Sequence, residues 1–393
     1  MTVCTSPGPR VAADAAPLTV TLCRDPRGFA ALEAQWNRLQ RCSTAATPFQ
    51  SHAWLHSWWL SYGREGRLRL VLVRRGERLV GAAALMLVHR PLPLLVPLGG
   101  PITDYFDVLV DAAEAAAVVP ALARGLYRAA RSTVIDLREV RPGAAAERVV
   151  QAWPGERRQL TDSACLELPA LDFDQLLTRM PTSNAQRTRA KARKLDALGI
   201  VERQIAPEEV PRAVANLLRL HELQWRGRGV TPEHLRPRFA EHLTRATRRM
   251  IRKGEANLTE FRLDGRVVAA NVTLLSTGIS GGYLYGADPE LRSRKVDVAT
   301  MLLRHDARRA VEGGQAALSL LRGTEPYKNH WRPETKVNQR YLLARGTLAP
   351  MLRLYESQLA GRERAADALR ETLPTARDWR ARLKNWRAGG ARP

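Results

Sequence analysis

Cysteine is scarce in this 393-residue chain, which has only Cys4, Cys23, Cys42 and Cys165. None of them has the CxxC spacing of a zinc site, and their scattered positions indicate no disulfide framework. The sequence therefore predicts no bound metal, and it favours the reducing cytoplasm as the location of the protein.

Long apolar segments are also lacking. The most apolar run, Leu79 to Val88, is too short to span a bilayer. Residues 1–17 have no apolar centre of the kind found in a secretory signal. We therefore expect no transmembrane segment and a disordered N-terminus over 1–17.

Lysine is scarce as well. The chain has 62 basic and 39 acidic residues, a net charge of +23, yet only seven of the basic residues are lysine. An excess of positive charge favours an anionic partner such as nucleic acid, a phosphate-rich cofactor or an acidic membrane. The bias toward arginine, together with abundant alanine, is typical of a high-GC genome and weakens that inference.

Two turn signals divide the chain into similar halves. Arg75-Gly76-Glu77 separates strand-like runs at 68–74 and 79–88, and Asp264-Gly265 separates runs at 258–263 and 267–275. Each hairpin follows a helical segment and precedes another strand and helix. We infer an internal duplication, with α/β (α+β) as the fold class and a mixed, mostly antiparallel sheet flanked by helices in each half.

The predicted organisation has five parts. They are a disordered N-terminus at 1–17, a first half at 18–165, a connecting basic helical segment at 166–198, a second half at 199–345 and a C-terminal amphipathic helical tail at 346–393. In the connecting helix, Arg187, Lys191 and Lys194 share one face. This face binds phosphate in one interpretation and is simply solvated in the other.

The tail predicts an amphipathic helix that docks on another surface, because Leu352, Tyr355 and Leu359 recur at helical spacing. Beyond Pro374 lies a short basic segment with Trp379 on its apolar face. It either contacts an anionic membrane peripherally or packs on its own chain.

The densest run of reactive side chains follows a short apolar strand at 316–321. It reads Leu-Arg-Gly-Thr-Glu-Pro-Tyr-Lys-Asn-His-Trp over 321–331. Active sites of open α/β sheets lie at the carboxyl ends of strands, so this run is a site candidate. The alternative is an ordinary surface turn.

The second half resembles the GNAT N-acyltransferase fold, and more narrowly the CelD/BioF-type acetyltransferase-like family, which is similar to the Fem-type aminoacyltransferases that build peptidoglycan bridges. The resemblance covers about 18–345 and is strongest over 182–345. Its motifs are Asn184–Lys194, the run from His221 to Arg228, the Asp264-Gly265 hairpin, the run from Gly281 to Pro289, and Arg322-Gly-Thr-Glu-Pro-Tyr-Lys328 followed by Trp331.

The resemblance implies a role for each matching residue. Tyr327 is similar to the general acid of many GNAT enzymes, with Glu325 as the nearest candidate base and His221 behind it. Substrate contacts are implied for six residues: Tyr285, Asp288, Arg322, Lys328, Trp225 and Trp331. Each also has a structural interpretation, as an ion pair between Glu325 and Lys328 or Arg322, or as core packing of the aromatic side chains.

The donor loop departs from the family pattern. GNAT enzymes hold the CoA pyrophosphate with a glycine-rich loop before a helix, and the matching stretch here runs from Arg294 to Ala299. Asp297 replaces the first glycine, which places a carboxylate and a Cβ where the phosphate approaches. Arg292, Arg294 and Lys295 supply positive charge there, and Ala299 fits the pattern.

Three functions remain open. The first is an N-acyltransferase that uses acetyl-CoA or another acyl-CoA, with no metal, and acts on a small-molecule or glycan-precursor amine in polysaccharide, envelope or secondary-metabolite biosynthesis. The second is a Fem-like transferase that uses aminoacyl-tRNA. The third is a non-catalytic pathway partner with a degenerate donor loop.

Overall fold

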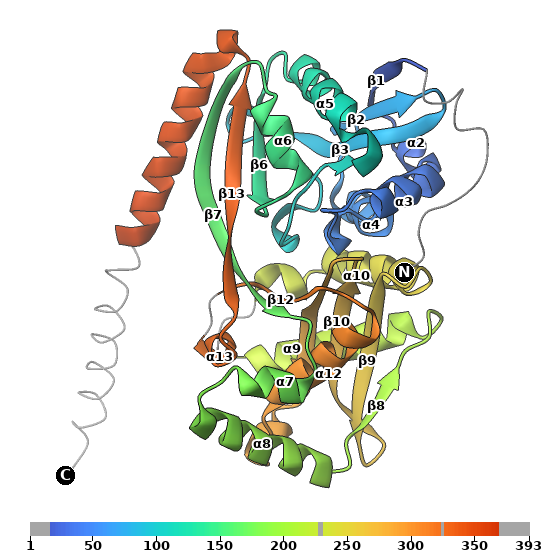
Figure 1. Ribbon diagram of the computed structural model, residues 1–393, viewed down its shortest axis with the longest axis vertical. Coiled ribbons are helices and arrows are strands. Elements are labelled where there is room, and N and C mark those ends of the chain that lie inside the picture. The colour runs from blue at the N-terminus through green and yellow to red at the C-terminus, as the bar shows by residue number, and fades with distance from the viewer. Residues whose placement is uncertain (1–15, 227–230, 324–325, 369–393) are drawn as a thin grey trace, which may run out of the picture.

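The computed structural model describes residues 16–226, 231–323 and 326–368. It shows two lobes joined by two long strands (Figure 1). Twelve of the strands form one continuous path, in the order β1-β2-β3-β4-β6-β13-β7-β12-β11-β10-β9-β8, and β5 pairs with β3 to one side. The fold class expected from the sequence is confirmed.

The first lobe holds strands β1 to β6. They are β1 (Leu18–Cys23), β2 (Leu68–Arg75), β3 (Arg78–His89), β4 (Pro93–Pro97), β5 (Leu109–Val110) and β6 (Val134–Val140). Its helices are α2 (Pro26–Ala31), α3 (Glu33–Cys42), α4 (His52–Tyr62), α5 (Ala115–Ala129) and α6 (Ala145–Gln151). The three tryptophans of α4 lie in the core, at most 6% exposed.

The second lobe repeats this order. Its strands are β8 (Val201–Gln204), β9 (Ala256–Leu263), β10 (Arg266–Leu275), β11 (Ile279–Ala287) and β12 (Ala317–Arg322). Its helices are α7 (Phe173–Thr178), α8 (Thr182–Ala197), α9 (Val210–Trp225), α10 (Pro237–Ile251), α11 (Glu290–Ser293), α12 (Val298–Glu312) and α13 (Pro326–Asn329).

The two hairpins occupy matching positions. β2 and β3 lie between β1 and β4, as β9 and β10 lie between β8 and β11. In each lobe the next contact is parallel, β4 with β6 and β11 with β12. This match agrees with the inferred duplication, whereas the exact domain boundaries remain a prediction.

The long strands β7 (Glu156–Pro169) and β13 (Glu334–Ala344) join the lobes. β13 lies between β6 and β7, and β7 lies between β13 and β12, all antiparallel (Figure 1). The strands of the first lobe therefore continue into β13 and those of the second lobe into β7, and β13 and β7 pair with each other.

The tail begins as a helix over 349–368. Leu352 and Tyr355 are buried against Leu342 and Val134 of the first lobe. The Tyr355 hydroxyl donates to Asp136 at 2.8 Å, and Arg340 also pairs with that carboxylate at 2.6 Å. The helix therefore docks on its own chain. The predicted basic segment around Trp379 lies outside the described residues.

Candidate functional site

The carboxyl ends of β6 and β12 meet at the centre of the sheet. The two strands run antiparallel to each other, with β13 and β7 between them. As a result, Arg322 at the end of β12 lies beside Glu139 near the end of β6, with Arg322 Nη1 2.8 Å from Glu139 Oε1. The strand pairing therefore brings together charges from both halves of the chain.

A loop of the first lobe completes this cluster. Residues 98–108 leave β4 and cross to the second lobe, where Asp104 Oδ1 pairs with Arg322 Nη2 at 2.9 Å. Arg322 also donates to the carbonyl of Pro101 at 2.7 Å. The Tyr283 hydroxyl donates to the carbonyl of Ile102 at 2.9 Å, which fixes the loop on β11.

Polar side chains from the central strands surround the ion pairs. Asn338 of β13 is fully buried and donates to Glu139 Oε2 at 3.0 Å and to the Asp104 carbonyl at 3.1 Å. Ser163 of β7 donates to the same carboxylate of Glu139. Lys328 of α13 is buried and donates to the Arg322 carbonyl at 3.0 Å.

Burial controls the electrostatics of this cluster. It raises the pKa of Asp104 above its usual value, and the nearby Glu139 carboxylate adds to this effect while Arg322 opposes it. The Asp104 side chain remains 12% exposed and the Arg322 side chain 31%. Asp104 is therefore a carboxyl group with a raised proton affinity that still reaches solvent.

Backbone strain marks the same place. Glu139 has a φ of 57° and Leu321 a φ of 56°. Left-handed backbone in residues other than glycine is costly and concentrates at functional sites. Glu139 is an ion-pair partner of Arg322 and Leu321 directly precedes Arg322 in the chain, which supports a functional role for the cluster.

A second network of hydrogen-bonded side chains joins the same loop to β7 and β12. The Tyr105 hydroxyl donates to Glu167 Oε1 at 3.1 Å and lies 2.9 Å from Ser319 Oγ. Arg141 holds the Glu167 carboxylate with two hydrogen bonds of 2.7 and 2.8 Å. This network fixes the 98–108 loop against β7 and β12.

β11 and β12 pair along only part of their length. The parallel register covers 279–281 of β11 against 317–319 of β12. Beyond Ser319, β12 pairs with β7 as far as Arg322, while β11 continues to Ala287 beside β10. β12 ends at the Asp104–Arg322 cluster, so a ligand held where the two strands separate would lie near it.

The predicted donor loop is closed by Asp297 and by two lysines of α8. The Asp297 carboxylate caps α12 by accepting from the Thr300 N–H at 3.0 Å, and it pairs with Lys191 of α8 at 2.6 Å. Lys194 donates to the carbonyls of Arg294 and Lys295 at 2.8 and 3.3 Å. The basic face predicted for α8 therefore binds the donor loop itself.

The remaining loop residues lie near the surface. Arg294 pairs with Glu290 at 2.6 Å, Arg292 is exposed, and Ala299 lies half-buried in the first turn of α12. The cation that pairs with Asp297 at the start of α12 is Lys191 of α8.

His221 lies at a different place, behind β11. Its Nδ1 is 2.7 Å from the Tyr285 carbonyl and its Nε2 is 3.2 Å from His234 Nδ1. Burial lowers the pKa of His221. The Trp225 ring lies 6.3 Å from the imidazole, so these two residues pack together as their helical spacing predicts.

Other predicted residues are spread over the second lobe. Trp331 is buried beside Phe173, with ring centroids 5.8 Å apart. The Asp288 carboxylate accepts from the Glu290 N–H at 2.9 Å, and Tyr285 packs half-buried beside Ala287 and Val296. Glu325 lies outside the described residues. Tyr327 lies in α13, but its side chain is outside the described part.

The structure thus unites Arg322 and Lys328 with residues that were missed from the sequence. These are Asp104, Glu139, Asn338, Tyr105 and Glu167. A signal existed for two of them, because Gly99-Gly100-Pro101 precedes Thr103-Asp-Tyr-Phe-Asp107, a polar run between strand segments.

Two searches of the described residues gave negative results. In the described ranges, no three histidine, cysteine or acidic side chains are grouped so that they could hold a metal ion. Among the helices of the same ranges, none combines the length and apolar character needed to cross a bilayer.

Residues 182–329 match the model of the acetyltransferase (GNAT) domain family. This segment contains β11, the donor loop, α12, β12 and α13. It therefore contains Arg322 and Lys328, whereas Asp104 and Glu139 come from the lobe before it.

Solved structures with similar folds cover most of the chain. FemX matches 82% of this chain and 98% of its own, with a TM-score of 0.59 and 12% identity. L-PGS from Bacillus licheniformis matches 84% and 96%, with a TM-score of 0.51 and 12% identity. The C-terminal domain of a protein assigned as a lysylphosphatidylglycerol synthetase from Agrobacterium fabrum matches 82% and 95%, with a TM-score of 0.52 and 10% identity.

These likenesses show the fold and, at such low identity, only the fold. No curated protein matches the chain significantly. Together, the family model and the solved structures support a GNAT-type acyltransferase fold and leave the donor and acceptor undetermined.

Proposed function

We propose that this protein transfers an acyl group from an activated donor, a CoA-type thioester, to an amine. The observation that supports this most is the cluster of Asp104, Arg322 and Glu139 at the carboxyl end of β12. It lies where β12 separates from β11; Arg322 belongs to the segment that matches the GNAT family, and Asp104 and Glu139 reach it from the first lobe.

Asp104 is the proposed general base. An amine must lose a proton to attack a carbonyl, and a general base is most effective when its pKa lies near the working pH. Burial raises the pKa of Asp104, and its side chain still reaches solvent. In this scheme the amine nitrogen attacks the thioester carbonyl, Asp104 receives its proton, and Tyr327 protonates the departing thiolate.

Arg322 is proposed as a positioning residue. Its guanidinium already pairs with Asp104 and Glu139, at 2.9 and 2.8 Å. A cation shared by two carboxylates has little charge left for a substrate carboxylate. It holds Asp104 in place, and Lys328 fixes the turn after β12 through the Arg322 carbonyl.

Donor binding can be tested by thermal unfolding with acetyl-CoA and longer acyl-CoA species. A ligand at one hundred times its Kd stabilises the folded state by about 2.7 kcal/mol. We expect a higher Tm with at least one acyl-CoA at millimolar concentration, and formation of an N-acylated product when amines are added. If no acyl-CoA raises the Tm, the CoA donor is excluded.

A second candidate is transfer from aminoacyl-tRNA. The Asp297 carboxylate and Lys191 occupy the place where a CoA pyrophosphate would approach α12. Arg187, Arg189 and Arg193 are exposed on the adjoining helix α8. FemX and L-PGS share the fold. If aminoacyl-tRNA supports N-acylation and acyl-CoA does not, this candidate replaces the first.

A further inference from the structure

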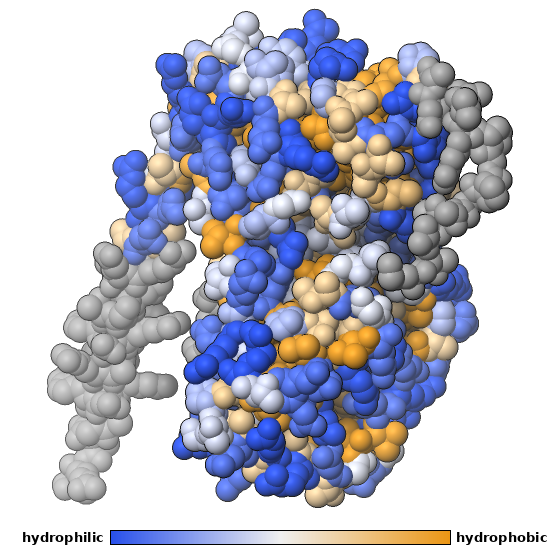
Figure 2. All heavy atoms as spheres, in the orientation of Figure 1, coloured by the Kyte–Doolittle hydropathy of each residue, from blue (hydrophilic) through white to orange (hydrophobic). Residues whose placement is uncertain are grey.

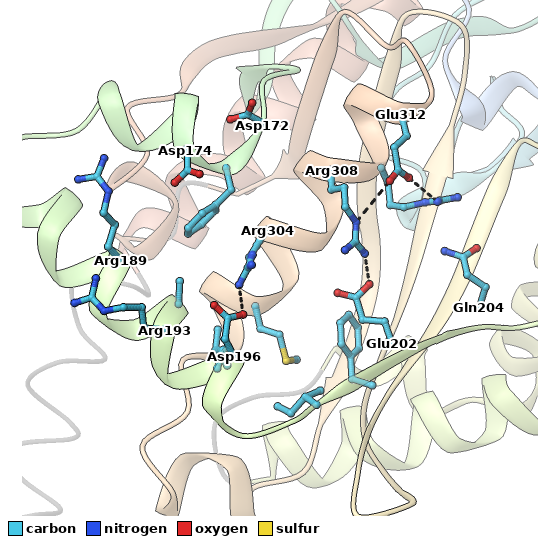
Figure 3. A pocket seen from close by; sticks show the side chains of 17 residues that line it. Asp172, Asp174, Arg189, Arg193, Asp196, Glu202, Gln204, Arg304, Arg308 and Glu312 are labelled. Carbon is cyan, nitrogen blue, oxygen red and sulfur yellow. Dashed lines mark hydrogen bonds and ion pairs between the residues drawn. The ribbon is translucent and has the colours of Figure 1, made fainter.

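The polar contacts on the outside of the second lobe are open to water. A hollow of about 1190 Å³ lies between α7, α8, α12 and the edge strand β8 (Figure 3). Its ion pairs include Arg304 with Asp196 and Arg308 with Glu202, and the two arginine side chains are 43% and 54% exposed. The surface of this lobe, at the lower end of Figure 2, is mainly hydrophilic. Exposed pairs hold side chains weakly, so a reacting group has to be positioned by buried contacts.

Buried side chains fix the backbone of the loop that carries Asp104. Asn338 of β13 donates to the carbonyl of Asp104 at 3.1 Å. Gln50, which precedes α4, donates to the carbonyl of the next residue, Tyr105, at 2.8 Å. Both donors are at most 3% exposed. The chain is therefore held at Asp104 and directly after it.

The residue before Asp104 is held by a tryptophan of α4. The Trp54 Nε1–H donates to Thr103 Oγ1 at 3.0 Å. Trp54 is fully buried and Thr103 is 5% exposed, so water does not compete for this bond. An indole N–H can only donate, and a buried one needs an acceptor. The bond therefore fixes the direction in which the chain enters Asp104.

Aromatic rings from both lobes hold the Trp54 indole in place. Phe49 of the first lobe lies 5.3 Å from it, measured between ring centroids. Tyr283 of β11 lies at 5.0 Å and His242 of α10 at 4.5 Å, and all three rings meet the indole edge to face. The indole cannot turn without displacing these rings. Thr103 is thereby held relative to the second lobe, to which Arg322 belongs.

A glycine leaves room for the Thr103 hydroxyl. Gly99 has a φ of 97°, a conformation that residues with side chains rarely adopt. A Cβ atom at this position would lie 2.2 Å from Thr103 Oγ1. Any other residue at position 99 would therefore push the hydroxyl away from the indole.

We propose that Trp54 is a positioning residue for acyl transfer, and that it acts through Thr103. The hydrogen bond between them holds the Asp104 carboxylate beside Arg322, where it receives the proton that the attacking amine loses. This inference rests on the proposed function, because that function makes Asp104 the general base.

The place of Asp104 also sets its affinity for a proton. Burial raises the pKa of its carboxyl group, Arg322 and Lys328 oppose this rise, and Glu139 adds to it. A loop released at Thr103 would let the carboxylate reach water. The pKa of Asp104 should then fall toward the usual aspartate range.

Carbon-13 NMR of protein with labelled aspartate carboxyl groups measures this effect without any substrate. The signal of Asp104 is the one that Asp104→Asn lacks. Thr103→Val removes the hydroxyl at nearly constant volume and should lower the pKa of Asp104. Thr103→Ser keeps the hydroxyl and should restore the original titration. Trp54→Phe should act like Thr103→Val, and the two substitutions together should lower the pKa no further than either alone.

Trp153→Phe is the matched control. Trp153 is 5% exposed, and its Nε1–H donates to the carbonyl of Ala344 at 3.0 Å, away from the loop. The variant loses an equivalent hydrogen bond in the first lobe and should leave the titration of Asp104 unchanged. An unchanged titration in both Thr103→Val and Trp54→Phe would overturn the proposal.

Turnover provides a second measurement. A misplacement of about 1 Å can lower a rate by roughly 10²-fold, so Thr103→Val and Trp54→Phe should each lower kcat by about tenfold or more, with the KM for the donor unchanged. The acid limb of the pH profile should move to lower pH in both variants, whereas Thr103→Ser should behave like the unmodified protein. If the unmodified protein forms no N-acylated amine while the titration responds as expected, the proposed function fails and the placement of Asp104 by Trp54 is still supported.

Discussion

Arg322 and Glu139 are 183 residues apart in the sequence, yet their side chains pair at 2.8 Å at the centre of the sheet. Each lies at the carboxyl end of a strand, and the two strands belong to different halves of the chain. The pair exists because β7, from the first half of the chain, pairs with β12, while β13, from the second half, pairs with β6. The proposed site therefore depends on both halves.

Breaking this pair should destabilise the protein. Arg322→Met leaves Glu139 and Asp104 buried without their cation, and we expect a loss of about 3 kcal/mol, the lower end for a buried pair, because Arg322 is partly exposed. Arg138→Ala is the matched control. It breaks a pair with Asp162 in which the arginine is 50% exposed, and should cost less than about 1 kcal/mol. Urea unfolding measures both. Equal losses would contradict this account of the cluster.

The donor loop makes a separate prediction. Asp297→Ser keeps a side chain that can cap α12 and removes the carboxylate, so acyl-CoA should bind more tightly to this variant. Asp297→Gly should also bind acyl-CoA more tightly, and should lose only a few tenths of a kcal/mol of stability with the cap, on the order of 0.3 kcal/mol. Titration calorimetry with acetyl-CoA measures the affinity. If neither variant changes it, the loop does not contact the donor.

Stability should fall in mild acid because of histidines between the lobes. Burial lowers the pKa of His52 to about 4, with smaller effects from His56 and Arg249, and burial likewise lowers the pKa of His56 to about 4. The unfolded chain, with a histidine pKa near 6.5, binds protons that the folded chain cannot accept. Stability is therefore complete above about pH 6.5 and falls as the pH drops toward 4.

Urea unfolding at several pH values tests this slope. His52→Gln combined with His56→Gln should reduce the loss of stability between pH 6.5 and 4. It should not abolish it, because burial also lowers the pKa of His234 to about 4 and of His242 to about 3. An unchanged slope in the double variant would show that His52 and His56 titrate normally.

Tyr327 remains the predicted general acid. Tyr327→Phe should lower turnover roughly 10²–10⁴-fold, the usual range for general acid–base catalysis, with little change in donor affinity. Glu325→Gln separates two roles of Glu325. A changed pH profile would indicate proton transfer, whereas a loss of stability with the same profile would indicate an ion pair.

Local patterns predicted much of the fold. The turn signals at Gly76 and Gly265 located both hairpins, because such turns require left-handed backbone, with φ of 56° and 75° here. The apolar run before Arg322 gave β12. The spacing of Leu352 and Tyr355 gave a tail helix that docks on the first lobe.

Only the residues of the site that belong to the second half of the chain were predicted. Arg322 and Lys328 belong to a dense polar run that is visible in the sequence. Asp104 and Glu139 join them through strand exchange between lobes, which no local pattern specifies. In the same way, the sequence indicated a basic face on α8 but not that Lys191 would bind Asp297.

The most direct test of the central claim compares the rates at which the unmodified protein and Asp104→Asn form an N-acylated amine. Mass spectrometry detects the product, with a panel of acyl-CoA donors and amines as substrates. The account predicts product with the unmodified protein and an acid limb in its pH profile above the usual aspartate range, because burial raises the pKa of Asp104. It predicts a loss of roughly 10²-fold or more in Asp104→Asn with unchanged donor affinity. Equal rates for the two proteins would contradict the assignment of the reaction to this cluster.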